Sequence, residues 1–220
     1  MEFLNSIKKR IEFYNSPFAH WEINKPLTTN QINEICETQI INLAEMNIKY
    51  DGTRAIDGGE GKFRQGITSG GKAIKFRNFI TKDNCDNYPN LNLLIQELRS
   101  KETHNFISEL IKKKLSNTFV RVEIICDRQG FWLKPHCDIK EKLISCLLFA
   151  NPFDESENLG TDLYDKNLKK IKTVPYKDNY GYFFSSGENT WHGMEKKEIK
   201  KERRCLQINY VTFETDWKVF

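Results

Sequence analysis

Apolar residues follow a helical period in the first half of this chain. They recur every three or four positions in three segments, and this spacing predicts amphipathic helices. The predicted helices cover residues 30–46, 89–101 and 103–115. Thr28, Thr29 or Asn30 can cap the first helix, Pro89 suits the first turn of the second, and Thr103 can cap the third.

The second half of the chain has a different pattern, of short apolar and β-branched runs between polar turns. Asp127–Gly130 and Asn151-Pro152 are two of these turns. The predicted strands cover residues 119–126, 143–150, 161–165, 170–175, 180–185 and 203–213. Many short strands at regular spacing indicate a sandwich or barrel, and we expect the helices to cover one outer face of its sheets.

Length and composition favour one folded domain. The chain has 220 residues, of which 39% are hydrophobic and 29% charged, enough apolar material for a core. We expect a single domain over residues 1–220, with a helical N-terminal part over 1–116 and a β core over 117–213. No apolar run reaches the roughly 20 residues that span a bilayer, and the start of the chain lacks a signal-peptide pattern. These features predict a cytoplasmic protein with no membrane partner.

Charge and cysteine spacing exclude several classes of partner. The net charge of +4 is too small to indicate nucleic acid. The six cysteines form no C-x-x-C pair, so neither a zinc ribbon nor a disulfide scaffold is expected. Residues 51–72 hold seven of the twelve glycines. Residues 66–73 nearly match a phosphate-binding loop, but Ala73 replaces the required hydroxyl residue, so we expect a flexible loop instead.

The candidate chemistry lies in the β-rich half. His136 and Asp138 are two residues apart, so on a strand both side chains point to the same side. His192, after the predicted strand 180–185, is the candidate third ligand. Two histidines and one carboxylate on one face of a metal ion leave three positions open, which suits non-haem Fe(II). Arg203, eleven residues further on, can bind a carboxylate through two parallel hydrogen bonds.

These motifs, in this order and spacing, resemble the double-stranded β-helix of the 2-oxoglutarate- and Fe(II)-dependent oxygenases. The resemblance is to the prolyl-hydroxylase-like branch and covers residues 117–213. The segments that carry it are 121–124, 130–138, 145–151, 160–164, 191–193 and 203–210, with a similar entry strand at 17–23. The fold class it implies is mainly β with supporting α-helices. The core would be a cupin-like jelly roll with the N-terminal helices packed on its major sheet.

The resemblance also implies cofactors and a reaction. His136, Asp138 and His192 would be the catalytic residues and bind Fe(II), with 2-oxoglutarate as chelating cosubstrate, O2 as oxidant and ascorbate as a helpful additive in vitro. The expected reaction is hydroxylation of an unactivated C–H bond with release of succinate and CO2. Desaturation and other oxidations remain open. The alternatives are a cupin-like metalloenzyme that does not use 2-oxoglutarate and a catalytically inactive ligand-binding jelly roll.

Four residues are expected at the cosubstrate. Arg203 and Arg204 face opposite sides of a strand, and alternation favours Arg203 because Leu206, Ile208 and Tyr210 then pack outward under the helices. The remaining candidates are matched by resemblance. Cys205 replaces the serine of a frequent R-x-S pattern, Ser145 falls where the family often has Thr or Ser, and Phe149 falls where prolyl hydroxylases have a tyrosine.

Substrate residues are the least constrained part of the site. Arg121, Glu123 and Trp132 are candidates for lining its mouth. Because the chain shows no separate recognition domain, we expect a small-molecule or amino-acid-type substrate. His20 is expected to be structural. The oligomeric state is not readable from the sequence.

Overall fold

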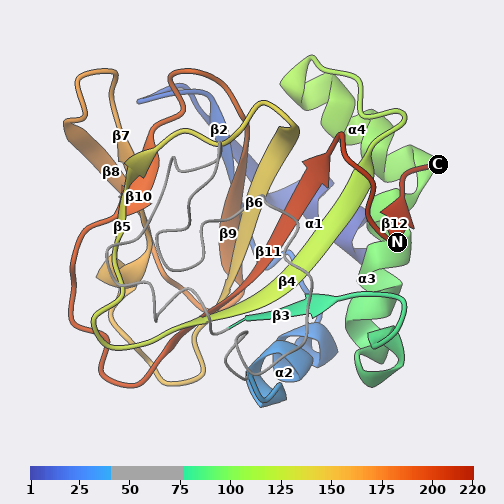
Figure 1. Ribbon diagram of the computed structural model, residues 1–220, viewed down its shortest axis with the longest axis horizontal. Helices are drawn as coiled ribbons and strands as arrows, with labels where there is room; N and C mark the ends of the chain where they lie inside the picture. Colours follow the sequence, from blue (N-terminus) through green and yellow to red (C-terminus); the bar gives the residue numbers. More distant parts are fainter. Residues whose placement is uncertain (41–76) are drawn as a thin grey trace.

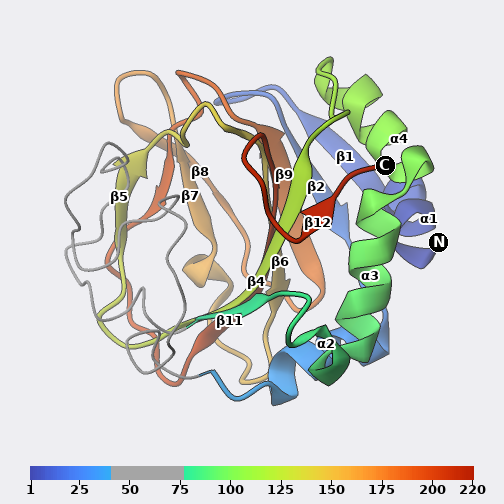
Figure 2. The ribbon, with the colours of Figure 1, turned by 45° about the vertical axis from the view of Figure 1, so that its right-hand side comes forward.

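Two antiparallel β-sheets face each other, and a layer of helices covers the outer face of the larger sheet (Figures 1 and 2). The computed structural model describes residues 1–40 and 77–220, so the predicted glycine-rich loop at 51–72 lies outside the described residues. The helices are α1 Glu2–Arg10, α2 Thr29–Glu37, α3 Pro89–Arg99 and α4 Lys101–Ile111, with 3-10 turns η3 Cys85–Asn87 and η4 Glu157–Leu159. None of these described helices has the length and apolar character needed to cross a membrane.

The larger sheet has eight strands and the smaller has four. The strands are β1 Ile11–Tyr14, β2 His20–Asn24, β3 Arg77–Ile80, β4 Phe119–Asp127, β5 Leu133–His136, β6 Lys142–Ala150, β7 Thr161–Tyr164, β8 Lys170–Val174, β9 Tyr180–Ser185, β10 His192–Met194, β11 Arg203–Val211 and β12 Trp217–Lys218. The larger sheet runs β1-β2-β9-β6-β11-β4-β12, with β3 also paired to β4, and the smaller runs β5-β10-β7-β8.

Strand alternation divides the interior into two cores. On β11, Leu206, Ile208 and Tyr210 join the apolar cluster between the larger sheet and the helices. Cys205 faces the other way, into the cluster between the two sheets. The prediction that these three apolar residues pack under the helices is therefore confirmed. The face between the sheets is the one available to a polar site.

The first half of the chain is less helical than its periodicity predicts. It contributes β1, β2 and β3 to the larger sheet as well as helix α1, which buries Phe3, Leu4 and Ile7. Helix α2 ends at Glu37, short of the predicted residue 46, and residues 41–46 lie outside the described residues. The Arg204 guanidinium from β11 donates hydrogen bonds to the carbonyl oxygens of Ile35 and Cys36 in the last turn of this helix and of Thr38, its C-cap.

The helix caps agree with the sequence in two cases and differ in one. Thr28 caps α2 in a capping box with Gln31, and Pro89 opens α3. The third helix starts earlier than predicted, since Ser100 and not Thr103 is its N-cap. The Ser100 hydroxyl accepts a hydrogen bond from the backbone N–H of Thr103.

An ionic network around the buried Glu22 joins the larger sheet at β2 to the smaller sheet at β8. Glu22 on β2 is 3% exposed and pairs with Lys172 on β8. The Tyr180 hydroxyl and the His20 ring also contact the Glu22 carboxylate. Burial acts to raise the pKa of Glu22, but the hydrogen bonds from His20, Lys172 and Tyr180 outweigh it and lower the pKa to about 2. His20 is thus part of a structural network, as expected.

Replacing Glu22 by glutamine is expected to make the free energy of unfolding less dependent on pH in the acid range. Because the folded pKa lies below the ordinary value of 4.5, the carboxylate stabilises the fold above that value and this stabilisation is lost as pH falls toward 2. We expect a loss of about 2 kcal/mol at pH 7 and a smaller loss at pH 3, measured by urea unfolding. The exposed Glu12, opposite Glu22 on β1, supplies the control variant Glu12→Gln. Equal destabilisation by Glu22→Gln at both pH values would contradict this account.

Candidate metal centre

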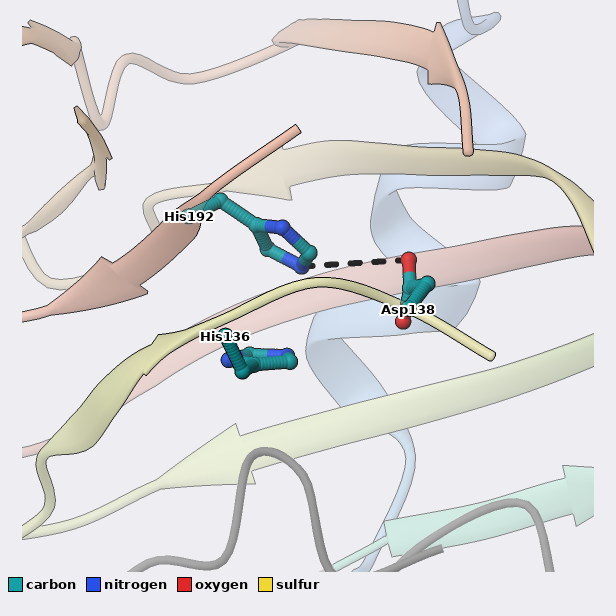
Figure 3. Close-up of side chains that lie close together, drawn as sticks. All are labelled: His136, Asp138 and His192. Atoms are coloured by element: carbon teal, nitrogen blue, oxygen red, sulfur yellow. Dashed lines mark ion pairs between the residues drawn. The ribbon is translucent and has the colours of Figure 1, made fainter. Parts of the chain in front are cut away.

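Three side chains meet at one end of the space between the sheets. His136 ends β5 and His192 begins β10, and the two are direct partners in the antiparallel pairing of these strands. Their ring centroids are 4.2 Å apart. Asp138 completes the group, and the candidate ligand atoms of the three residues all lie within 4.8 Å of one another (Figure 3).

The strand pairing explains this convergence better than the H-x-D spacing does. Strand β5 ends at His136, so His136 and Asp138 do not share a strand, contrary to the prediction. Asp138 reaches the site from the segment that follows β5. Its Oδ2 lies 3.8 Å from Nε2 of His192 (Figure 3). Strand pairing therefore brings the two histidines together, and Asp138 joins them from outside the strands.

The protonation states suit a metal ion. Nδ1 of His136 lies 2.9 Å from the carbonyl oxygen of Lys134, and Nδ1 of His192 lies 2.9 Å from that of Thr190. A carbonyl oxygen only accepts, so each Nδ1 carries the proton and each Nε2 keeps its lone pair. Burial lowers the pKa of His136 to about 3 and also lowers the pKa of His192. Both imidazoles are neutral at physiological pH and able to bind a cation.

The Asp138 carboxylate is ionised and held on both oxygens. Burial acts to raise its pKa, but Lys142 and the two imidazoles outweigh burial and lower the pKa. Lys142 Nζ lies 2.6 Å from Oδ1. Ser145 Oγ donates to Oδ2 at 2.7 Å, and Asn209 Nδ2 donates in turn to Ser145 Oγ at 3.4 Å. Ser145, predicted to lie near the cosubstrate, thus contacts a candidate metal ligand.

The two adjacent arginines of β11 have separate partners. Arg203 faces the space between the sheets, where Nη1 lies 2.5 Å from Asp127 Oδ2 and Nε donates to the Leu159 carbonyl oxygen at 2.5 Å. The described residues offer its Nη2 no hydrogen-bond partner. Arg204 points to the opposite side, to the end of α2. Of these two arginines, Arg203 is the one whose guanidinium faces the space between the sheets.

Two other predicted cosubstrate residues lie against Arg203. The Phe149 ring centroid is 5.2 Å from the guanidinium carbon of Arg203, and Cys205 Sγ is 3.8 Å from its Nη1. Both side chains are fully buried. The structure therefore brings Phe149, Cys205 and Arg203 together, and it places Ser145 at the other end of the group, beside Asp138.

Comparison with known proteins identifies this architecture. No family model and no curated protein matches the sequence. Among solved structures, a prolyl-4-hydroxylase from Pseudomonas putida aligns with TM-score 0.58 and 11% identity over 96% of this chain and 100% of its own. A prolyl hydroxylase from Trichoplax adhaerens aligns with TM-score 0.53 and 18% identity over 96% of this chain and 88% of its own. This chain has the prolyl hydroxylase fold.

A third structure supports the same conclusion. A prolyl 4-hydroxylase from Phytophthora capsici aligns with TM-score 0.56 and 14% identity over 87% of this chain, which spans 58% of that longer protein. At sequence identities of 11–18%, these structural alignments show a shared fold. They confirm the predicted double-stranded β-helix with helices on its major sheet.

Within the prolyl hydroxylase fold, Tyr182 on β9 is a candidate site residue that the sequence analysis missed. Its ring stacks on Phe184 at 6.1 Å and lies 6.3 Å from Phe149. Burial raises the pKa of its hydroxyl, which stays protonated, and both Arg203 and Asp138 act on it electrostatically. The hydroxyl is also hydrogen-bonded to the side chain of Thr161 on β7, so it faces the space between the two sheets. Two-residue alternation along 180–185 could have assigned Tyr182 to this face.

The predicted mouth residues are more buried than expected. Arg121 and Arg77 both pair with Glu123, at 2.9 and 3.1 Å, and all three side chains are buried. Arg121 lies opposite Asn209 on β11, and Asn209 lies opposite Ser145 on β6, so this cluster continues the polar row that reaches Asp138. Trp132 is half-buried before β5, with the Lys134 ammonium 5.9 Å from its ring centroid.

The expected small-molecule substrate is a wrong prediction. The Trichoplax adhaerens prolyl hydroxylase is in complex with a hypoxia inducible factor oxygen degradation domain peptide fragment. This chain covers 88% of that protein, so that protein binds a peptide although most of its length matches this chain. The lack of a separate domain in the sequence is therefore no indication of a small-molecule substrate.

Proposed function

We propose that this chain is an Fe(II)- and 2-oxoglutarate-dependent oxygenase that hydroxylates a residue in a peptide or protein. The observation that carries the proposal is the convergence of His136, Asp138 and His192 within 4.8 Å in a prolyl hydroxylase fold. Two neutral imidazoles and one carboxylate are the donor set that non-haem Fe(II) prefers. Bound Fe(II), with 2-oxoglutarate and O2, supplies the oxidation that converts C–H to C–OH, with succinate and CO2 as the other products.

The protein's own part begins with the three ligands. His136 and His192 are fixed by carbonyl partners, and Asp138 is fixed by Lys142 and Ser145. This hydrogen bonding holds each donor atom in place before a metal arrives, so little side-chain entropy is lost on binding. His136, His192 and Asp138 would together hold Fe(II), which would also bind the cosubstrate and O2.

Arg203 and Tyr182 are proposed to bind the far carboxylate of 2-oxoglutarate. Arg203 offers Nη2, and Tyr182 offers a protonated hydroxyl that is hydrogen-bonded to Thr161 and is acted on electrostatically by both Arg203 and Asp138. Phe149 has no hydroxyl to donate, and its ring is a neighbour of Tyr182. Phe149 and Cys205 then form the apolar wall that keeps water from the Arg203–Asp127 pair.

The remaining assignments concern the substrate and the domain. We propose that Trp132, beside β5, contacts the substrate near His136, and that Arg121 and Glu123 fix the polar wall behind it. We also propose that residues 1–220 act as one domain, because the helices share a single apolar core with the larger sheet.

The test is peptide-dependent turnover. Purified protein is incubated with Fe(II), ascorbate, O2 and 2-oxoglutarate together with a library of proline-containing peptides, since the structural neighbours are prolyl hydroxylases. We expect succinate formation that a subset of peptides stimulates, and mass spectrometry should find one added oxygen on those peptides. The Asp138→Ala chain should give neither product. Stimulation by free amino acids but by no peptide would contradict the proposal.

A further inference from the structure

Lys142 occupies an unusual place beside the candidate metal centre. It begins β6 directly after a turn closed by its own backbone N–H and the Ile139 carbonyl oxygen. Its ammonium lies 2.6 Å from Oδ1 of Asp138, and the two side chains are 5% and 7% exposed. A buried cation is stable only beside a buried anion, so this contact is a strong one.

The two oxygens of Asp138 consequently differ in their surroundings. Oδ1 is occupied by the Lys142 ammonium. Oδ2 accepts one hydrogen bond, from Ser145, and faces His192 Nε2 at 3.8 Å. A carboxylate oxygen has two lone pairs, so Oδ2 retains one for a cation beside the histidines. Asn209 holds Ser145 in turn, which fixes the plane of the carboxylate.

Resting on the proposed function, we infer that Lys142 sets both the denticity and the charge of the metal centre. It keeps Oδ1 from the metal, so Asp138 binds through Oδ2 alone and a coordination position stays open for 2-oxoglutarate. Its positive charge also cancels that of the Asp138 carboxylate. The three ligand side chains and the Lys142 ammonium together then carry no net charge, which weakens the binding of a divalent cation and strengthens the binding of a dianionic cosubstrate.

This role makes a prediction that a merely structural role does not make. Removing a residue that only orients a metal ligand by hydrogen bonding typically lowers metal affinity by about 10- to 100-fold. Removing a cation that competes with the metal should instead raise the metal affinity. The Lys142→Met chain should therefore bind metal more tightly and 2-oxoglutarate more weakly than the wild type.

The experiment uses the full chain and Mn(II) as a redox-inert probe. Calorimetry gives the Mn(II) dissociation constant first and then the 2-oxoglutarate dissociation constant of the Mn(II)-loaded protein. We expect Lys142→Met to bind Mn(II) about tenfold more tightly and 2-oxoglutarate about tenfold more weakly. Lys142→Arg keeps the charge and should stay close to the wild type. Lys140→Met removes an exposed charge from the same segment and should change neither constant.

The outcomes separate this inference from the proposed function. Weakening of both ligands by Lys142→Met, or no change in either, overturns the role of Lys142 and leaves the proposed function intact. A wild-type chain that binds no Mn(II) overturns both. If Lys142→Met does not fold, Lys142→Gln replaces it, because glutamine keeps a hydrogen-bond donor without the charge and must shift the two constants in the same opposite directions.

Discussion

A His192→Ala chain is expected to lose 2-oxoglutarate turnover almost completely. His192 faces both other ligands, with its ring 4.2 Å from that of His136 and its Nε2 3.8 Å from Asp138. Its removal leaves two donors, which cannot hold the ion against water. The rate of succinate formation should fall by more than roughly 100-fold, the largest loss typically seen when a residue that only hydrogen-bonds to a metal ligand is removed. Coupled succinate detection measures this.

His104, a histidine outside the site, provides the matched control. His104 lies in α4, in the helical layer on the other side of the larger sheet (Figure 2). His104→Gln should retain the wild-type rate per folded molecule. A similar loss in both variants, or full activity in His192→Ala, would show that the metal centre is assigned to the wrong residues.

Replacing Arg203 by lysine is expected to weaken 2-oxoglutarate binding by about 10- to 100-fold, because lysine cannot place a second donor beside the first. The lysine keeps a positive charge next to the buried Asp127, so the fold avoids the loss of about 3–5 kcal/mol that follows when one partner of a buried pair is removed. Titration of the metal-loaded chain with 2-oxoglutarate gives the dissociation constant.

Arg204→Lys is the control for this prediction. Arg204 binds the end of α2 on the other face of the strand, so its replacement should lower stability and leave the affinity for 2-oxoglutarate unchanged. The reverse result, with Arg204 setting the affinity and Arg203 having no effect, would contradict the assignment of the two arginines.

The strands of the core could be predicted from the sequence because their signal is local. Strand β9 has the predicted bounds, and β4, β6 and β11 differ by at most two residues at an end. Alternation on β11 also predicts the side that Arg203 faces, because a two-residue period leaves only two possibilities. Helix ends were predicted less well. Helix α2 ends where Arg204, far away in sequence, takes its carbonyl groups, and no local pattern indicates this contact.

The site was predictable only in part, because some of its contacts also join residues that are far apart in the sequence. His136, Asp138 and His192 belong to motifs that can be found along the chain. Tyr182 and Lys142 carry no such motif, since their roles depend on which strands are neighbours. The pairing of β6 with β9 brings Tyr182 beside Leu147, and the turn before β6 brings Lys142 to Asp138. The predicted substrate class was wrong because it was inferred from the domain pattern of the sequence, and a single domain can bind a peptide as well as a small molecule.

Anaerobic equilibrium dialysis against Fe(II) tests the central claim most directly. With 2-oxoglutarate present, the wild-type chain should retain one iron per molecule, and a chain with His136, Asp138 and His192 all replaced by alanine should retain none above background. Circular dichroism of both chains checks that the triple variant is folded. Stoichiometric iron in the triple variant, or none in the wild type, would contradict the claim that these three side chains form an iron site.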